Sequence, residues 1–170
     1  MKRILIICIA AVVLSCNTAA AQVVVKGNTL LLGKISIQQL EQSPFAEWYK
    51  TGYTAYQPDP LVKDSLAAIV KPYRFELFFG TWCGDSQREV PRLMKLLDDL
   101  HIKPSDVTII AVGNSDTLYK QSPAHEEKGK SILRVPTLNV YMEGKEVGRI
   151  IEVPAKSWEK DLLGIINKRP

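Results

Sequence analysis

A cysteine stands at the junction between a short apolar run and a helical pattern, and this junction constrains the fold more than any other feature. Residues 75–79 are almost continuously apolar, which is typical of a buried strand. A helical pattern starts near Gln87, so Cys83 falls where a strand ends and a helix begins. Unpaired N–H groups at a helix N-terminus favour the thiolate form of a cysteine. We therefore predict that Cys83 is a reactive thiol.

The residue three positions after Cys83 is Ser86 rather than a second cysteine. The pattern is that of a dithiol redox site whose second thiol is absent. We expect the Ser86 hydroxyl to donate a hydrogen bond to the Cys83 thiolate, to cap the helix, or to do both. The carboxylate of Asp85 opposes the charge of the thiolate unless it pairs with a cation such as Arg88.

The start of the chain has the pattern of an export leader. Lys2 and Arg3 precede an apolar run over residues 4–14, which is too short to span a bilayer as a helix. The alanines at 19–21 supply small residues for signal-peptide cleavage before Gln22. We therefore expect an exported protein, periplasmic or extracellular.

Two processing schemes for this leader stay open. Either residues 1–21 form a signal peptide, or residues 1–15 form a lipoprotein signal and Cys16 becomes a lipid anchor in the membrane. Cys8 is lost in both schemes, and Cys16 is either lost or lipidated. Cys83 is then the single thiol left to react in an oxidising compartment, and an internal disulfide is excluded.

Composition excludes some classes of function. The chain has 170 residues, of which 46% are hydrophobic and 24% charged, as expected for one folded domain with a core. Its 22 basic and 18 acidic side chains show no basic stripe interleaved with aromatics, so nucleic acid is not an expected partner. His125 next to Glu126 and Glu127 offers too few ligands for a metal site. We expect neither a metal nor a cofactor.

Apolar patterns divide the rest of the chain into an extension over residues 22–72 and a domain over residues 73–170. The extension is predicted to be mostly helical after a hairpin over residues 22–34. The element order of the domain is β-α-β-(α)-β-β-α, which implies an α/β fold with a mixed central sheet flanked by helices on both faces. The predicted elements lie at residues 75–79, 84–100, 107–112, 137–142, 146–151 and 156–167, with a loop around a short helix within 114–134.

Residues 73–168 resemble the thioredoxin superfamily. Trp82-Cys83-Gly84 matches the active-site motif of that family, and Pro91 stands where the family has the kink proline of its active-site helix. Val135-Pro136-Thr137 matches the cis-proline tripeptide at the start of a strand. The resemblance implies a thioredoxin-like fold and a cis peptide bond before Pro136.

Three positions depart from the family pattern. Ser86 replaces the resolving cysteine, and Leu77 replaces the buried carboxylate that accepts a proton. Glu152 stands in place of a glycine that lines the peptide-binding groove, and we expect it to approach the thiol or to pair with Arg149.

The resemblance implies thiol–disulfide exchange or isomerisation on protein thiols and disulfides, with Cys83 as the attacking residue and Ser86 as its support. Trp82, Val135, Pro136 and Thr137 are then expected to bind the client protein. Because a serine cannot resolve a mixed disulfide, release requires a client thiol, a small thiol or an external reductase. The alternative is a redox-silent binding module or chaperone-like protein that keeps the groove, so whether the chain is an enzyme stays open.

Overall fold

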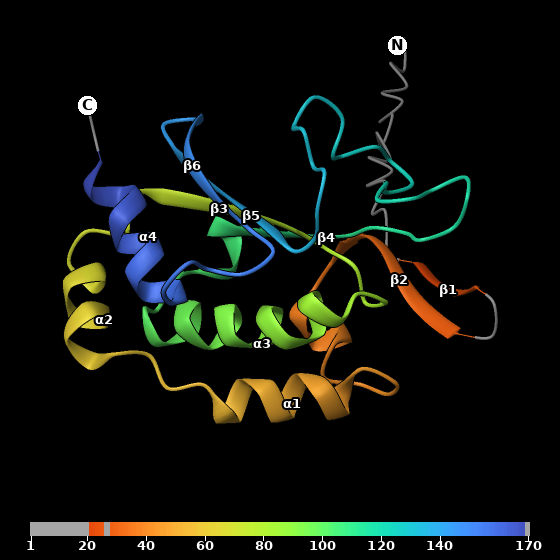
Figure 1. Ribbon diagram of the computed structural model, residues 1–170, viewed down its shortest axis with the longest axis horizontal. Helices are drawn as coiled ribbons and strands as arrows, with labels where there is room; N and C mark the ends of the chain where they lie inside the picture. Colours follow the sequence, from red (N-terminus) through yellow and green to blue (C-terminus); the bar gives the residue numbers. More distant parts are fainter. Residues whose placement is uncertain (1–20, 26–27, 169–170) are drawn as a thin grey trace, which may run out of the picture.

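The computed structural model of the protein describes residues 21–25 and 28–168 (Figure 1). The predicted leader, with Cys8, Cys16 and most of the segment before Gln22, lies outside the described residues. The described strands are β1 (Ala21–Val25), β2 (Asn28–Ile35), β3 (Tyr73–Phe79), β4 (Val107–Ala111), β5 (Thr137–Met142) and β6 (Lys145–Ile151). The described helices are α1 (Ala46–Ala55), α2 (Pro60–Ala67), α3 (Gly84–Asp99) and α4 (Trp158–Asn167), with 3₁₀ turns η1 (Ile37–Gln39) and η2 (Pro104–Asp106).

Within the described residues the strands form a single sheet in the order β1-β2-β4-β3-β5-β6. The central strands β3 and β4 are parallel and are connected through α3, while β5 and β6 are antiparallel to their neighbours. The chain from β3 to α4 therefore follows the thioredoxin-like order that the sequence predicts. The mixed α/β sheet flanked by helices is confirmed.

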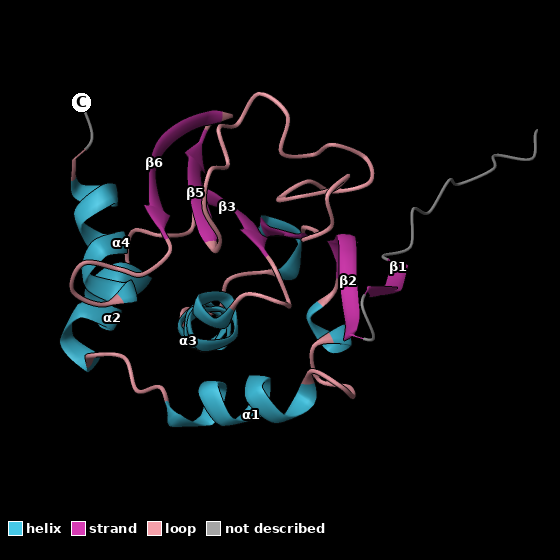
Figure 2. Cartoon of the chain, turned by 45° about the vertical axis from the view of Figure 1, so that its right-hand side comes forward, coloured by secondary structure: helices cyan, strands magenta, loops and turns pink. Residues whose placement is uncertain are grey.

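The face of the sheet opposite the helices is covered by a loop. The four described helices lie on one side of the sheet (Figures 1 and 2). Between β4 and β5, the residues predicted to contain a short helix form turns and bends only. This part of the prediction, and with it the expectation of helices on both faces, is wrong. The segment 114–134 is polar and contains Pro123 and Gly129, so it has no apolar stripe that a helix would bury.

Alternation along the central strand separates two apolar clusters. Leu77 and its neighbours at alternate positions pack in the larger cluster with Val90 and Leu93 of α3. Phe78 points to the other face and packs in a smaller cluster with Val135 of the covering loop. Leu77 is fully buried among apolar side chains, so the position of the family's proton acceptor belongs to the core here.

The N-terminal extension is joined to the sheet and to the helical layer. Its predicted hairpin is the pair β1 and β2, and β2 also pairs antiparallel with β4, with Gly33 opposite Ala111. Helix α1 packs along α3, and α2 packs on α4 (Figure 1). The extension thus supplies one strand next to the central pair and a second helical layer over α3.

The contact between α1 and α3 depends on a close approach at Gly52. A Cβ atom on Gly52 would lie 2.6 Å from Cγ of Pro91, a separation that real Cβ contacts do not show. Pro91 lies inside α3 and is buried. The absent side chain at Gly52 therefore sets how near α1 comes to the helix that begins at Cys83.

We predict that Gly52→Ala lowers the free energy of unfolding by about 1–3 kcal/mol, because the new methyl group overpacks the α1–α3 contact. Gly164 is the matched control, since it also lies in a helix and a Cβ there meets nothing within 4 Å. Gly164→Ala should raise the free energy of unfolding by about 0.5–1 kcal/mol through helix propensity alone. Urea titrations of both variants measure these changes, and equal effects of the two substitutions would contradict the close-approach argument.

A buried carboxylate in α4 fastens the extension to the domain. Glu159 is only 4% exposed, and it accepts hydrogen bonds from the Tyr56 hydroxyl at 2.6 Å and the Asp59 N–H at 3.2 Å. The Ser157 hydroxyl donates a third at 2.7 Å. Burial alone would raise the pKa of Glu159, but these hydrogen bonds outweigh it and hold the pKa below its ordinary value of 4.5.

Because the folded state lowers this pKa, the ionised Glu159 stabilises the fold above the ordinary pKa of 4.5 that the residue has in the unfolded chain. That contribution is lost as the pH falls through the lower folded value. We predict that Glu159→Gln lowers the free energy of unfolding by about 1.5–3 kcal/mol at pH 7, the usual range for hydrogen bonds to a charged group. The difference between wild type and variant should shrink below about pH 4. Chemical unfolding at pH 7 and pH 3.5 tests this, and a difference that grows on acidification would contradict it.

Candidate active site

The sulfur of Cys83 lies at the start of α3, beside the loop that leads into β5. Cys83 is the N-cap residue of α3, with extended backbone angles (φ −92°, ψ 123°), and it is half-buried. Its thiol donates a hydrogen bond to the carbonyl oxygen of Val135 at 3.3 Å. The strand-to-helix junction predicted for Cys83 is therefore confirmed, and the Val135–Pro136 loop lies against the sulfur.

A tight turn presents the cysteine. The Cys83 N–H donates to the Gly80 carbonyl at 3.0 Å, and the Trp82 indole N–H donates to the Val112 carbonyl at 2.9 Å. The indole folds over Gly80 so closely that a Cβ there would lie 2.5 Å from the indole nitrogen. A side chain at residue 80 would push the Trp82 ring away from the Val112 carbonyl, so this turn requires glycine at position 80.

The same turn is attached to α3 and to the N-terminal extension through Thr81. The Gln87 side-chain amide donates to the Thr81 carbonyl at 2.8 Å. From β2, the Leu31 N–H donates to the Thr81 hydroxyl at 3.3 Å, and both groups are buried. The extension therefore contacts the cysteine-bearing turn directly.

Ser86 faces the backbone of the turn. Its side chain is fully buried, and its hydroxyl oxygen accepts a hydrogen bond from the Gly80 N–H at 3.2 Å. Within the described residues it makes no hydrogen bond to the Cys83 sulfur. Since Cys83 is the N-cap of α3 and Ser86 follows three residues later, the expectation that Ser86 caps the helix is wrong. Ser86 supports the site by holding the turn.

The tripeptide opposite the sulfur is buried. The Val135–Pro136 peptide bond is cis, as predicted, and the side chains of Val135, Pro136 and Thr137 are all buried. The Thr137 hydroxyl donates to the Arg134 carbonyl at 2.7 Å, and the Glu152 N–H donates to the Pro136 carbonyl at 2.7 Å. The tripeptide therefore presents the Val135 carbonyl, a backbone atom, to the Cys83 sulfur.

The charged residues near the site are paired. Asp85 binds Arg88 at 2.8 Å, as predicted, and hydrogen bonds to Glu89 and Asp85 raise the pKa of Arg88. Glu152 binds Arg134 at 2.6 Å rather than Arg149, so that part of the expectation is wrong. Glu152 also has a left-handed backbone (φ 60°), which explains why a glycine suits this position in the family it resembles.

Helix α3 also contains a buried carboxylate, Glu89, that the sequence analysis did not predict. Glu89 is buried and accepts hydrogen bonds from the Trp158 indole N–H at 3.0 Å, from Arg88 at 2.7 Å and from Arg92 at 3.2 Å. It follows the polar residues of the first helical turn, so periodicity alone does not distinguish it from a solvated glutamate. Its contacts tie α3 to α4.

The loop that carries Val135 is tied to the sheet by a polar network. Lys130 forms an ion pair with Glu76 of β3, and the Tyr141 hydroxyl donates to Glu76 at 3.1 Å. Arg149 of β6 donates to the Lys130 carbonyl at 3.0 Å. Asn139 lies in the same region, and its carbonyl oxygen is buried without a hydrogen-bond partner in the described structure. The network anchors the loop at Lys130, five residues before Val135, whose carbonyl accepts a hydrogen bond from the Cys83 thiol.

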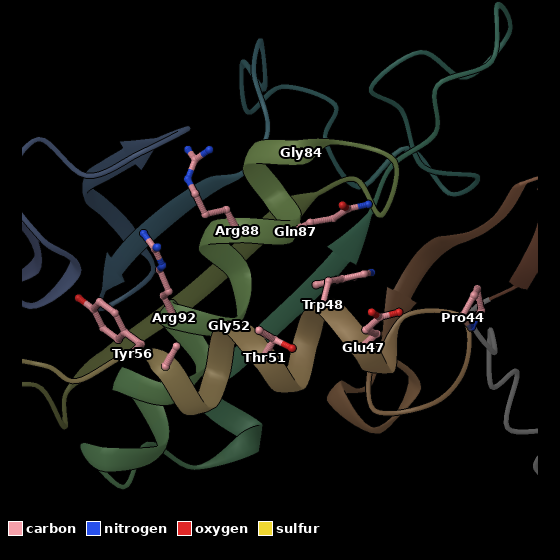
Figure 3. Close-up of a pocket in the computed structure, with 11 residues that line it drawn as sticks. Pro44, Glu47, Trp48, Thr51, Gly52, Tyr56, Gly84, Gln87, Arg88 and Arg92 are labelled. Carbon is pink, nitrogen blue, oxygen red and sulfur yellow. The ribbon is translucent and has the colours of Figure 1, made fainter.

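A groove of about 620 Å³ adjoins the first residue of α3. It runs between α1 and α3 and is lined by Pro44, Trp48, Tyr56, Gly84, Arg88 and Arg92 among others (Figure 3). Gly84, the residue after Cys83, lines this groove, but Cys83 does not.

Within residues 21–25 and 28–168, no group of three or more His, Cys, Asp or Glu side chains is placed to hold a metal ion. None of the helices in these ranges is long and apolar enough to cross a membrane.

Comparison with known proteins gives structural likeness only. No family profile and no curated protein sequence matches the chain. An HIV epitope-scaffold is 18% identical, with a TM-score of 0.49, over 74% of this chain and 83% of the scaffold. A protein of unknown function from Pseudomonas aeruginosa is 16% identical, with a TM-score of 0.49, over 72% of this chain and 81% of that one. Oxidized mitochondrial thioredoxin 3 from Saccharomyces cerevisiae is 21% identical, with a TM-score of 0.39, over 69% and 99%.

The buried hydroxyl of Ser86 gives a prediction that separates support of the turn from support of the thiol. Ser86→Ala leaves the Gly80 N–H without its acceptor, so the free energy of unfolding should fall by about 1–3 kcal/mol. The rate of Cys83 alkylation by iodoacetamide should change less than about twofold, because the hydroxyl does not bond the sulfur. A large loss of alkylation rate with unchanged stability would contradict this assignment.

Proposed function

We propose that this chain performs thiol–disulfide exchange on client proteins through Cys83 alone. The observation that carries the proposal is the position of the sulfur at the N-terminus of α3, half-buried and 3.3 Å from the Val135 carbonyl. Partial positive charge at a helix N-terminus stabilises a developing thiolate. A sulfur enclosed by side chains or distant from the Val135 loop would not support exchange.

The exchange step conserves atoms and electrons. Cys83 gives its proton to solvent, and the thiolate then gives up the hydrogen bond to the Val135 carbonyl, since it has no proton to donate. The thiolate attacks one sulfur of a client disulfide, the client S–S bond breaks, and the other client sulfur leaves as a thiolate with the bonding electron pair. The freed Val135 carbonyl is then available to accept a backbone N–H of an extended client segment.

The mixed disulfide needs a second thiol for release. Cys83 is the one cysteine among the described residues, and Ser86 has no sulfur with which to resolve the adduct. A thiolate from the client, from a small thiol or from an external reductase attacks the client sulfur and regenerates the Cys83 thiolate. Any of these thiols makes the chain a monothiol exchanger or isomerase. Without a client, small or reductase thiol, the chain holds its client in a covalent complex.

The sequence of the leader supports the proposal that the clients are exported proteins. Lys2, Arg3, the apolar run at residues 4–14 and the alanines at 19–21 form a pattern typical of secretory signals. Disulfides form and persist in the compartments that such signals lead to. A monothiol exchanger that acts on protein disulfides finds its substrates there.

We predict that the chain beginning at Gln22 reactivates scrambled ribonuclease only when glutathione is added, and that Cys83→Ser abolishes this activity. Ser86→Cys places a second thiol one helical turn after Cys83 and should give insulin reduction with dithiothreitol at least about tenfold above wild type. Urea titration of each variant verifies that it is folded under the assay conditions, since Ser86→Cys alters the buried hydroxyl that binds the Gly80 N–H. If wild type shows no glutathione-dependent turnover while Ser86→Cys reduces insulin, the chain is a redox-silent binding module on a competent scaffold.

A further inference from the structure

An exposed aromatic side chain from the covering loop stacks beside the candidate thiol. Tyr119 lies against Trp82, with ring centroids 6.1 Å apart and an interplanar angle of 34°. Trp82 precedes Cys83 and is fixed to the Val112 carbonyl through its indole N–H. Tyr119 nevertheless remains 55% exposed, so the stack presents an aromatic surface to solvent next to the sulfur.

Lys120 links this stack to the loop that leads into β5. Its ammonium group lies over the Tyr119 ring, 5.0 Å from the ring centroid, and donates a hydrogen bond to the Leu133 carbonyl at 2.7 Å. Leu133 is 77% exposed and stands two residues before Val135, whose carbonyl accepts from Cys83. One cation therefore contacts both the exposed Tyr119 ring and the main chain of the exposed Leu133.

The backbone around Tyr119 is ordered by its own hydrogen bonds. Gly113 forms an isolated bridge with Tyr119, and its carbonyl accepts from the Lys120 N–H at 2.9 Å. The Gly113 N–H donates to the Gln121 carbonyl at 2.9 Å. Because Gly113 directly follows Val112, the segment that carries Tyr119 is tied to the residue that fixes Trp82. The exposed ring therefore needs little further ordering when a ligand binds.

We propose that Trp82, Tyr119 and Leu133 form a client-binding shelf that selects disulfides flanked by aromatic or large aliphatic residues. The proposal rests on the proposed exchange at Cys83 and names its substrate class. Single exposed apolar side chains are ordinary, but the Trp82–Tyr119 stack next to Cys83, linked through Lys120 to the exposed Leu133, marks an interaction surface. The ammonium of Lys120 repels a cationic neighbour, so a client segment with apolar and uncharged flanks fits the shelf best.

The test uses short peptides whose single cysteine carries a nitrothiobenzoate disulfide. Attack by the Cys83 thiolate on the peptide sulfur forms the mixed disulfide and expels the coloured nitrothiobenzoate thiolate, so each reaction is followed by absorbance. One peptide has phenylalanine next to its cysteine, and the matched peptide has serine there. We expect wild type to react about 3- to 10-fold faster with the phenylalanine peptide, which corresponds to one aromatic contact.

Tyr119→Ala should reduce this preference to less than about twofold, and Tyr119→Phe should keep it. Leu61→Ala is the matched control, because Leu61 is an exposed apolar residue of α2, 80% exposed, outside the shelf. Alkylation of Cys83 by iodoacetamide should be unchanged in all three variants, which verifies that the thiol is intact.

The possible failures are distinguishable. If wild type shows no preference, or if Tyr119→Ala keeps it, the shelf is overturned while exchange at Cys83 stands. If Cys83→Ser releases nitrothiobenzoate as fast as wild type, the proposed exchange itself is overturned, and the shelf with it.

Discussion

Gly80 shapes the turn that presents the cysteine through two backbone hydrogen bonds and through its lack of a side chain. Its N–H binds the buried Ser86 hydroxyl, its carbonyl accepts from the Cys83 N–H, and its missing side chain leaves room for the Trp82 indole. Each interaction fixes a different neighbour of the sulfur, namely the first turn of α3, the backbone of the cysteine and the aromatic wall beside it. The orientation of the thiol toward the Val135 carbonyl follows from this arrangement.

The sequence was sufficient to predict the chain from β3 onward where local patterns agree with the tertiary fold. The apolar strand before Cys83 and the amphipathic helix after it both bury faces that their own periodicity defines. The cis bond at Pro136 was predicted because the tripeptide resembles a known motif rather than from composition. The position of the cysteine at a helix N-terminus could therefore be predicted, whereas the orientation of Ser86 depends on a backbone contact that no pattern encodes.

Features that depend on contacts distant in sequence were not predictable. The hairpin at the start of the extension was expected, but its pairing with β4 is a choice of partner that alternation does not specify. Glu89 and Glu159 look like solvated glutamates in the sequence, and only the helices that pack on them make them buried hydrogen-bond acceptors. The loop over the second face was expected to contain a helix, but its turns instead carry Tyr119 against the Trp82 ring, a contact that no local pattern encodes.

The antiparallel pairing of β2 with β4 has a consequence for how this protein can be divided. A fragment that begins at residue 73 would leave the outer edge of β4 with unpaired main-chain groups and would uncover the side of α3 that faces α1. Bare strand edges recruit strands from neighbouring molecules, so such a fragment is prone to self-association. The first strands and helices of this protein therefore protect the edge of β4 from intermolecular pairing. A thioredoxin-sized fragment that begins at residue 73 should not be expressed alone or fused to other proteins.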